Sequence, residues 1–359
     1  MGSCQDTYSN TKEPSTCKRR NGHDPERSET PEGRLTKMKV QAHATNDGVR
    51  DPVPSFSWRT LGTAIRETTD KGDKEMGTTT ATPSRATTIA FPLRYFVLAF
   101  AFTWFFWGLA VLGARGVIPT LPGFMVLGTF GPMVAAIVLT AQESGRAGMR
   151  YLLVRVVCWR VSPVWYVVAL LGPILLYLAA MALNVALGGQ PPDLATLIGS
   201  LPIVLAISVY MLIFVALGEE VGWRAYALPA LQARYGALLA SVILGVIWAL
   251  WHLPQFFNPD TIYSNLPFIL QLVLQVPFAI LITWVYNSTR GSVLMVMLLH
   301  AVFNAGGQLW KTIPEYSVRP PSAAGAAAQT VHINLMITIV LWVAAVVIVL
   351  AYGSHNLSR

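Results

Sequence analysis

The chain has 359 residues, of which 53% are hydrophobic and only 12% are charged. A soluble globular protein of this size carries about twice that charged fraction, so the composition excludes an ordinary soluble enzyme and indicates a membrane protein. The net charge of +8 does not indicate a nucleic-acid-binding protein, because the excess of Lys and Arg lies in the loops between apolar runs.

Residues 1–90 form a polar segment that holds 14 of the 26 Lys and Arg residues and 12 of the 18 Asp and Glu residues. The segment is rich in Thr, Ser and Pro and poor in aromatic residues, which is typical of disorder. It contains no short apolar core behind a basic start, so we expect no cleavable signal peptide. Met76 is an equally good candidate for the native start, in which case residues 1–75 are not part of the native protein.

Eight apolar runs follow, and each is long enough to cross a hydrocarbon core of about 30 Å. We therefore expect an all-α polytopic membrane bundle of about eight transmembrane helices over residues 91–352, followed by a short tail at 353–359. The runs are 93–113, 123–142, 164–187, 201–220, 236–254, 267–286, 292–310 and 332–352.

The basic residues of the loops predict the orientation of this bundle. With the N-terminus inside, nine of the Lys and Arg residues after residue 90 are cytoplasmic, and only Arg115, Lys311 and Arg319 are outside. This bias predicts that both termini are cytoplasmic. Residues 146–162 carry an arginine every four or five positions, a pattern that fits an amphipathic helix on the anionic inner leaflet and equally an ordinary basic loop.

Two adjacent carboxylates, Glu219 and Glu220, are the only acidic residues inside the apolar runs. Such residues are expensive in a membrane and generally face a bundle interior. On a helix, Glu220 faces Arg224 four residues later and can pair with it. Glu219 is rotated away by about 100°, so we expect a free carboxylate that is suited to general acid or base chemistry. A purely structural ion pair is the simpler alternative.

Two histidines, His252 and His300, lie in the interior of the runs. Trp248 shares a helical face with His252 and can restrict its ring, although a histidine at the end of a span is more often an interface residue. His300 and Asn304 share another face, so both can donate hydrogen bonds to one oxyanion. Alternatively, His300 binds a metal with Asn304 in support, or the pair only links helices.

In chain order, the three motifs EExxxR, aromatic-xxx-His and HxxxN resemble the CAAX prenyl protease and bacteriocin-processing family of intramembrane proteases. The resemblance covers about residues 91–352, which would then be an intramembrane protease domain, and it suggests a bacterial plasma membrane. One departure is Trp248, where the family usually has Phe. The implied substrate is a peptide or protein, prenylated or otherwise membrane-anchored, that is cleaved within the lipid bilayer.

The resemblance implies a role for each residue of the motifs. Glu219 would activate a water molecule with help from His252, while His300 and Asn304 would stabilise the oxyanion. The supporting residues would be Glu220, Arg224 and Trp248. A zinc enzyme is the alternative, in which Glu219, His252 and His300 bind Zn²⁺ and leave a fourth position for water.

Other protease classes lack their motifs here, because the chain contains no HExxH, GxSG or GxGD sequence. Asn258-Pro259-Asp260 resembles a site-2 protease element but has no HExxH partner. Two different functions stay open, namely a non-catalytic scaffold or immunity-type protein and a transporter with a proton relay.

The predicted spans place two of the candidate site residues at different depths in the membrane. They place Glu219 at the inner end of its span and His252 some 16 residues into the next one, about 24 Å apart. A shared site requires the fourth helix to start deeper, or residues 225–240 to continue as helix beyond the membrane. Pro229 is the expected position of a break.

Overall fold

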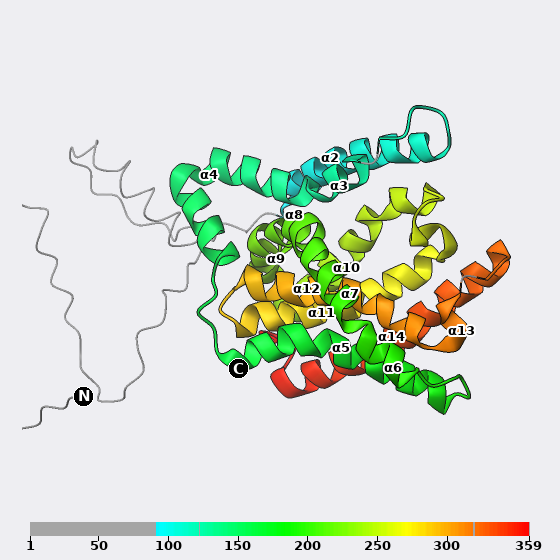
Figure 1. Cartoon of the computed structure of the whole chain (residues 1–359). Helices are drawn as coiled ribbons and strands as arrows, with labels where there is room; N and C mark the ends of the chain where they lie inside the picture. The colour runs from blue at the N-terminus through cyan, green and yellow to red at the C-terminus, as the bar shows by residue number, and fades with distance from the viewer. Residues whose placement is uncertain (1–90, 122, 319, 359) are drawn as a thin grey trace, which may run out of the picture. The chain divides into compact units, whose positions relative to one another are not determined.

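The computed structural model describes residues 91–121, 123–318 and 320–358, which all belong to one compact unit, Ser84–Arg359 (Figure 1). Within these ranges the regular elements are all helices, which confirms the all-α prediction. The polar segment 1–90, with the alternative start at Met76, lies outside the described residues.

Seven helices in the described part are long and apolar enough to cross a membrane, and an eighth is added if one pair bent by 45° is a single span. This confirms a multi-pass membrane protein. The candidate spans are α2 (Leu93–Ala114), the bent pair α3 (Gly123–Thr129) and α4 (Gly131–Val156), α5 (Pro163–Ala186), the helical run Leu194–Tyr235, the run Ala237–Phe257 that contains α10 (Ala237–Trp251), α11 (Phe268–Ser288), the run Val293–Thr312 that contains α12 (Val293–Gly306), and α14 (Ala323–Tyr352).

The fourth span is much longer than the predicted 201–220. It comprises α6 (Leu194–Gly199), α7 (Leu201–Met211), α8 (Leu217–Gly222) and α9 (Leu228–Tyr235), with π-helical turns at Leu212–Ala216 and Trp223–Ala227. Glu219 therefore lies near the middle of a run of 42 residues and not at its inner end. The helix beyond residue 225 was one of the two solutions to the conflict in depth, and the structure adopts it as far as Tyr235.

The predicted break at Pro229 does not occur. Proline interrupts a regular helix because it lacks an N–H group and clashes with the carbonyl four residues earlier. Here a π turn directly precedes it, and the N–H of Leu228 donates to the carbonyl of Trp223, five residues back. This wider turn accommodates the proline ring. The chain reverses only at Gly236, whose φ of 74° favours glycine.

Two glycines on α8 bring this helix against the start of α4. A Cβ atom on Gly218 would lie 2.7 Å from the carbonyl oxygen of Thr129, and one on Gly222 would lie 2.4 Å from the backbone of Pro132. Small residues four positions apart allow such close approach of helices in membranes. The glycines and the two carboxylates thus share a short helix that is buried from Gly218 to Gly222.

We expect Gly222→Ala to lower the free energy of unfolding by about 1–3 kcal/mol, because the added methyl group meets backbone atoms that cannot move aside. The matched control is Gly172→Ala in α5, where a Cβ atom meets nothing within 4 Å. The control should be neutral or slightly stabilising, because alanine favours helix. Thermal unfolding in detergent, followed by circular dichroism, measures both, and equal midpoints would contradict this packing.

The basic segment 146–162 is helical only in its first part. α4 bends at Gly145, which has φ 51° and ψ −140°, and ends at Val156. Arg146 and Arg150 are exposed in this part and Leu152 is buried, as the amphipathic prediction requires. Residues 157–162 are not α-helical, so helix covers about two thirds of the segment, and its placement on the inner leaflet stays a prediction.

The C-terminal tail packs against the bundle. The N–H groups of Ala237 and Leu238, at the start of α10, donate to the carbonyls of His355 and Ser354 at 2.8 and 3.0 Å. These amides would otherwise lack partners, as the first N–H groups of any helix do. Leu357 is fully buried. The tail therefore caps the helix that presents Trp248 and His252.

Candidate active site

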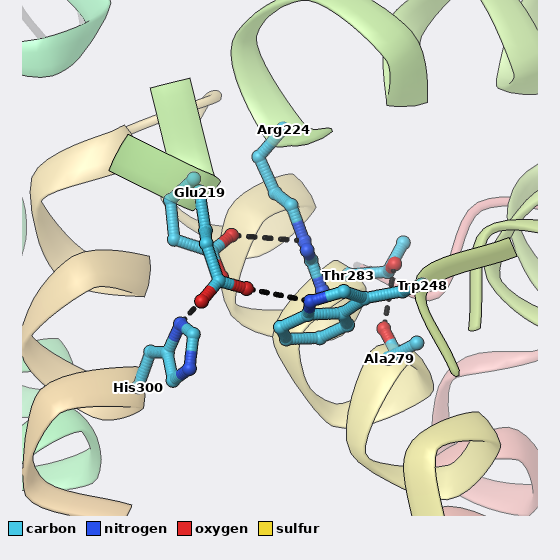
Figure 2. A network of polar contacts seen from close by, with 7 residues as sticks. Glu219, Arg224, Trp248, Ala279, Thr283 and His300 are labelled. Carbon is cyan, nitrogen blue, oxygen red and sulfur yellow. Dashed lines mark hydrogen bonds and ion pairs between the residues drawn. The ribbon is translucent and has the colours of Figure 1, made fainter. Parts of the chain in front are cut away.

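Three helices bring the predicted residues together. α8 supplies Glu219 and Glu220, α10 supplies Trp248 and ends at His252, and α12 supplies His300. Figure 2 shows Glu219, Trp248 and His300 converging in one polar cluster, with Arg224 reaching in from the next helical turn. The two π turns flank α8 on both sides, and such turns are frequent at functional sites.

Glu220 holds two partners from opposite directions. Its Oε2 lies 3.1 Å from Nε of Arg224, and both side chains are fully buried. Its Oε1 accepts a hydrogen bond of 2.7 Å from Nδ1 of His300. The predicted ion pair is thus confirmed, whereas the bond to His300 was not predicted. Because removal of one partner leaves a buried charge uncompensated, this arrangement strongly restricts α8 relative to α12.

Glu219 is less free than predicted. Its Oε2 accepts a hydrogen bond of 2.6 Å from the indole Nε1 of Trp248. Within the described residues, no hydrogen bond to its Oε1 is found. One oxygen of the carboxylate is therefore held in place, and the other is available to a reacting molecule. The rotation of Glu219 away from Arg224 was predicted correctly, but the partner from α10 was missed.

Trp248 lies at the centre of the cluster. The guanidinium carbon of Arg224 lies 4.3 Å from the centroid of its ring, within the range of a cation–π interaction. Its ring is 5.3 Å from that of His300 and 6.3 Å from that of His252. The predicted packing against His252 is present, and the indole also supplies a hydrogen-bond donor that a phenyl ring lacks.

His252 occupies the C-terminal end of α10. Its Nδ1 lies 2.8 Å from the carbonyl oxygen of Trp248. A carbonyl oxygen only accepts, so Nδ1 donates, and in the neutral ring the lone pair is then on Nε2. Tyr263 stacks on the imidazole at 5.3 Å and Trp251 contacts it edge-on at 4.8 Å. These contacts fix the orientation of the ring.

Asn304 lies on α12, one helical turn after His300, and is half-buried. This places both residues on one face of the helix, as the spacing predicts. Its part in oxyanion stabilisation stays a prediction, as do the catalytic roles of the other residues.

The zinc hypothesis requires Glu219, His252 and His300 to surround one ion. In the described ranges, no three His, Cys, Asp or Glu side chains are grouped closely enough to hold a metal ion. Nδ1 of each histidine already has a partner, in Trp248 and Glu220 respectively, so only Nε2 of each ring could bind a metal. The residues present in this conformation do not fit a Zn²⁺ site, and dependence on zinc stays a prediction for experiment.

Sequence reasoning missed two aromatic or ionisable residues near or within the spans. Tyr263 follows His252 in a short loop, and no spacing pattern marks it. His332 lies inside α14, because that helix begins at Ala323 and not at residue 332. Its Nε2 is 2.9 Å from Oδ1 of Asn184. The earlier start of α14, extended by small alanines, was the signal that could have identified it.

Comparisons with known proteins agree with the motifs. Residues 200–306 match the family model described as type II CAAX prenyl endopeptidase, Rce1-like. CAAX prenyl protease 2 of Methanococcus maripaludis is 34% identical over 110 residues, which are 28% of this chain and 39% of that relative. The chain thus matches about two fifths of the length of this relative. Residues 200–306, which contain the whole polar cluster, are therefore similar to the Rce1-like type II CAAX prenyl endopeptidases.

Proposed function

We propose that the chain is an intramembrane endopeptidase that hydrolyses a peptide bond with a water molecule activated by Glu219. The observation that carries this proposal is the buried Glu219 carboxylate, which accepts a hydrogen bond from Trp248 on one oxygen while its other oxygen has no hydrogen-bond partner among the described residues. The match of residues 200–306 to a peptidase family supports it.

In this proposal, Oε1 of Glu219 accepts a proton as the water oxygen bonds to the peptide carbonyl carbon. Nε2 of His252 carries a lone pair when the ring is neutral and shares in accepting that proton. The C–N bond then breaks, and the proton passes to the departing amine.

The developing oxyanion needs donors, and His300 and Asn304 are the proposed ones. Because Nδ1 of His300 already donates to Glu220, its donor toward substrate is a proton on Nε2. The Glu220 carboxylate, which accepts from Nδ1, fixes the orientation of the His300 ring. Glu220 and Arg224 thereby act through His300 and do not touch the substrate.

The proposed substrate is a peptide or protein held at the bilayer, prenylated or otherwise membrane-anchored. The name of the relative, CAAX prenyl protease 2, supports the prenylated class. The excess of basic residues in the loops on the side of the N-terminus supports cytoplasmic termini. The proposed location in a bacterial plasma membrane rests on the family resemblance.

The test uses the purified full chain in liposomes with three fluorogenic peptides that share one sequence, farnesylated, acylated and unmodified. We expect cleavage of a lipidated peptide and little cleavage of the unmodified one. A proton flux without cleavage would instead identify a transporter. If neither cleavage nor proton flux is observed, the non-catalytic scaffold is the remaining function.

A further inference from the structure

We infer that Trp248 is a positioning residue that holds the Glu219 carboxylate through the indole N–H, and that Arg224 acts on Glu219 through this ring. The inference deepens the proposed peptidase function and rests on it. Nothing in the spacing of the motifs assigns this role, because Trp248 shares a helical face with His252 and not with Glu219.

The hydrogen bond is short and shielded from solvent. Nε1 of Trp248 lies 2.6 Å from Oε2 of Glu219, and the two residues are 1% and 2% exposed. Hydrogen bonds to an ionised acceptor are shorter and stronger than those between neutral groups. Water cannot readily replace this donor at such burial. The bond therefore selects one orientation of the carboxylate and leaves Oε1 for the attacking water.

The ring that supplies this donor is itself held in place. Phe278 of α11 stacks on it at 5.8 Å with an interplanar angle of 24°. The guanidinium of Arg224 lies 4.3 Å from its centroid. Rotation of the indole would lose both contacts, so the direction of its N–H is constrained from two sides.

Arg224 also affects the strength of the donor. A cation over an indole face draws electron density from the ring and makes the N–H a stronger hydrogen-bond donor. The guanidinium is anchored by Glu220 at 3.1 Å. The two neighbouring carboxylates are thus connected through space, from Glu220 through Arg224 and Trp248 to Glu219. The supporting carboxylate helps to determine where the reacting one lies.

The first test compares Trp248→Phe with wild type on the lipidated peptide. Phe keeps an aromatic ring against Phe278 and Arg224 but removes the N–H. We expect kcat to fall about tenfold with KM within about twofold, because substrate contacts are unchanged and only the carboxylate is released. The matched control is Trp310→Phe, since Trp310 is buried and its Nε1 has no hydrogen-bond partner within the described residues.

A second measurement does not depend on activity. The indole N–H resonance of Trp248 is assigned in ¹⁵N-tryptophan-labelled protein by its loss in Trp248→Phe. In Glu219→Gln we expect this resonance to move upfield, because a neutral amide is a weaker acceptor than a carboxylate. The resonance should also move in Arg224→Met, which removes the cation, and it should stay unchanged in Glu315→Gln on the surface.

The outcomes separate this inference from the proposed function. Wild-type cleavage with an equal kcat in Trp248→Phe overturns the positioning role and leaves the peptidase intact. An unmoved resonance in Glu219→Gln overturns it as well, even if the folded Trp248→Phe variant has lost all cleavage activity. Absence of cleavage by wild type overturns the peptidase function itself, and with it any catalytic role of Trp248.

Discussion

Glu219→Gln is expected to lower kcat for peptide cleavage by about a thousandfold while the protein remains folded, since a positioned general base contributes about 10²–10⁴ in rate. Glutamine has nearly the same shape, and its side-chain carbonyl can still accept from the Trp248 indole. The amide cannot take a proton from water, however. The loss should therefore appear in kcat with little change in KM, as measured with the lipidated peptide in liposomes.

The matched control for this substitution is Glu315→Gln, because Glu315 is exposed on the short helix Pro314–Ser317. The control should retain wild-type rates. Wild-type activity in Glu219→Gln would contradict the mechanism, because a group other than Glu219 would then activate the water. Partial loss, with a matching loss in Glu315→Gln, would indicate a general effect of the substitution on the preparation.

Chelation is a second arm of the same experiment. Loss of wild-type activity with a chelator and its recovery with Zn²⁺ would mean that Glu219, His252 and His300 come together when substrate binds. Unchanged activity would support a reaction that uses the carboxylate without a metal ion. The zinc content of the purified protein, measured by elemental analysis, provides a readout that is independent of turnover.

Arg224→Met is expected to destabilise the fold by about 3–5 kcal/mol, the cost of leaving one member of a buried ion pair without its partner. Glu220 and Arg224 are both fully buried, so water cannot compensate for the missing charge. Methionine fills much of the volume of the arginine stem but offers no charge and no cation–π contact to Trp248. Heat- or denaturant-induced unfolding in mixed micelles measures this loss.

The double variant Glu220→Gln with Arg224→Met removes both charges and should recover a large part of the stability, because replacing a whole buried pair is far less harmful than breaking it. Arg150→Met is the surface control, since Arg150 is exposed on α4. Equal destabilisation in the single and double variants would contradict an ion-pair origin. It would then indicate that packing of the arginine stem accounts for the effect.

Much of the fold is predictable because a bilayer imposes a length and a polarity on every span. The apolar runs near residues 93–113, 164–187 and 267–286 correspond closely to α2, α5 and α11. The runs whose ends were wrong, 201–220 and 332–352, continue as helix into polar or small residues. Hydropathy does not predict these additional helical residues, because they are stabilised by hydrogen bonds and packing and not by transfer into lipid.

Contacts within a single helix of the site were also predictable from the spacing of residues in the sequence. The contact between Glu220 and Arg224 follows from the rise of one helix, as does the common face of His300 and Asn304. The grouping of the three motifs was predicted from the cost of placing ionisable side chains in a membrane. These inferences need only the geometry of a single helix or the energetics of a single side chain.

The contacts between helices could be identified only in the folded structure. The bonds from Trp248 to Glu219 and from His300 to Glu220 depend on the depth and rotation of α8 relative to α10 and α12. Two π turns set that rotation, and the close approach of Gly222 to Pro132 sets the position of α8. Composition and helical period therefore determine which residues enter the membrane. Packing determines which oxygen of Glu219 accepts a hydrogen bond and which does not, because hydrogen-bond direction depends on interhelical distances that no single helix encodes.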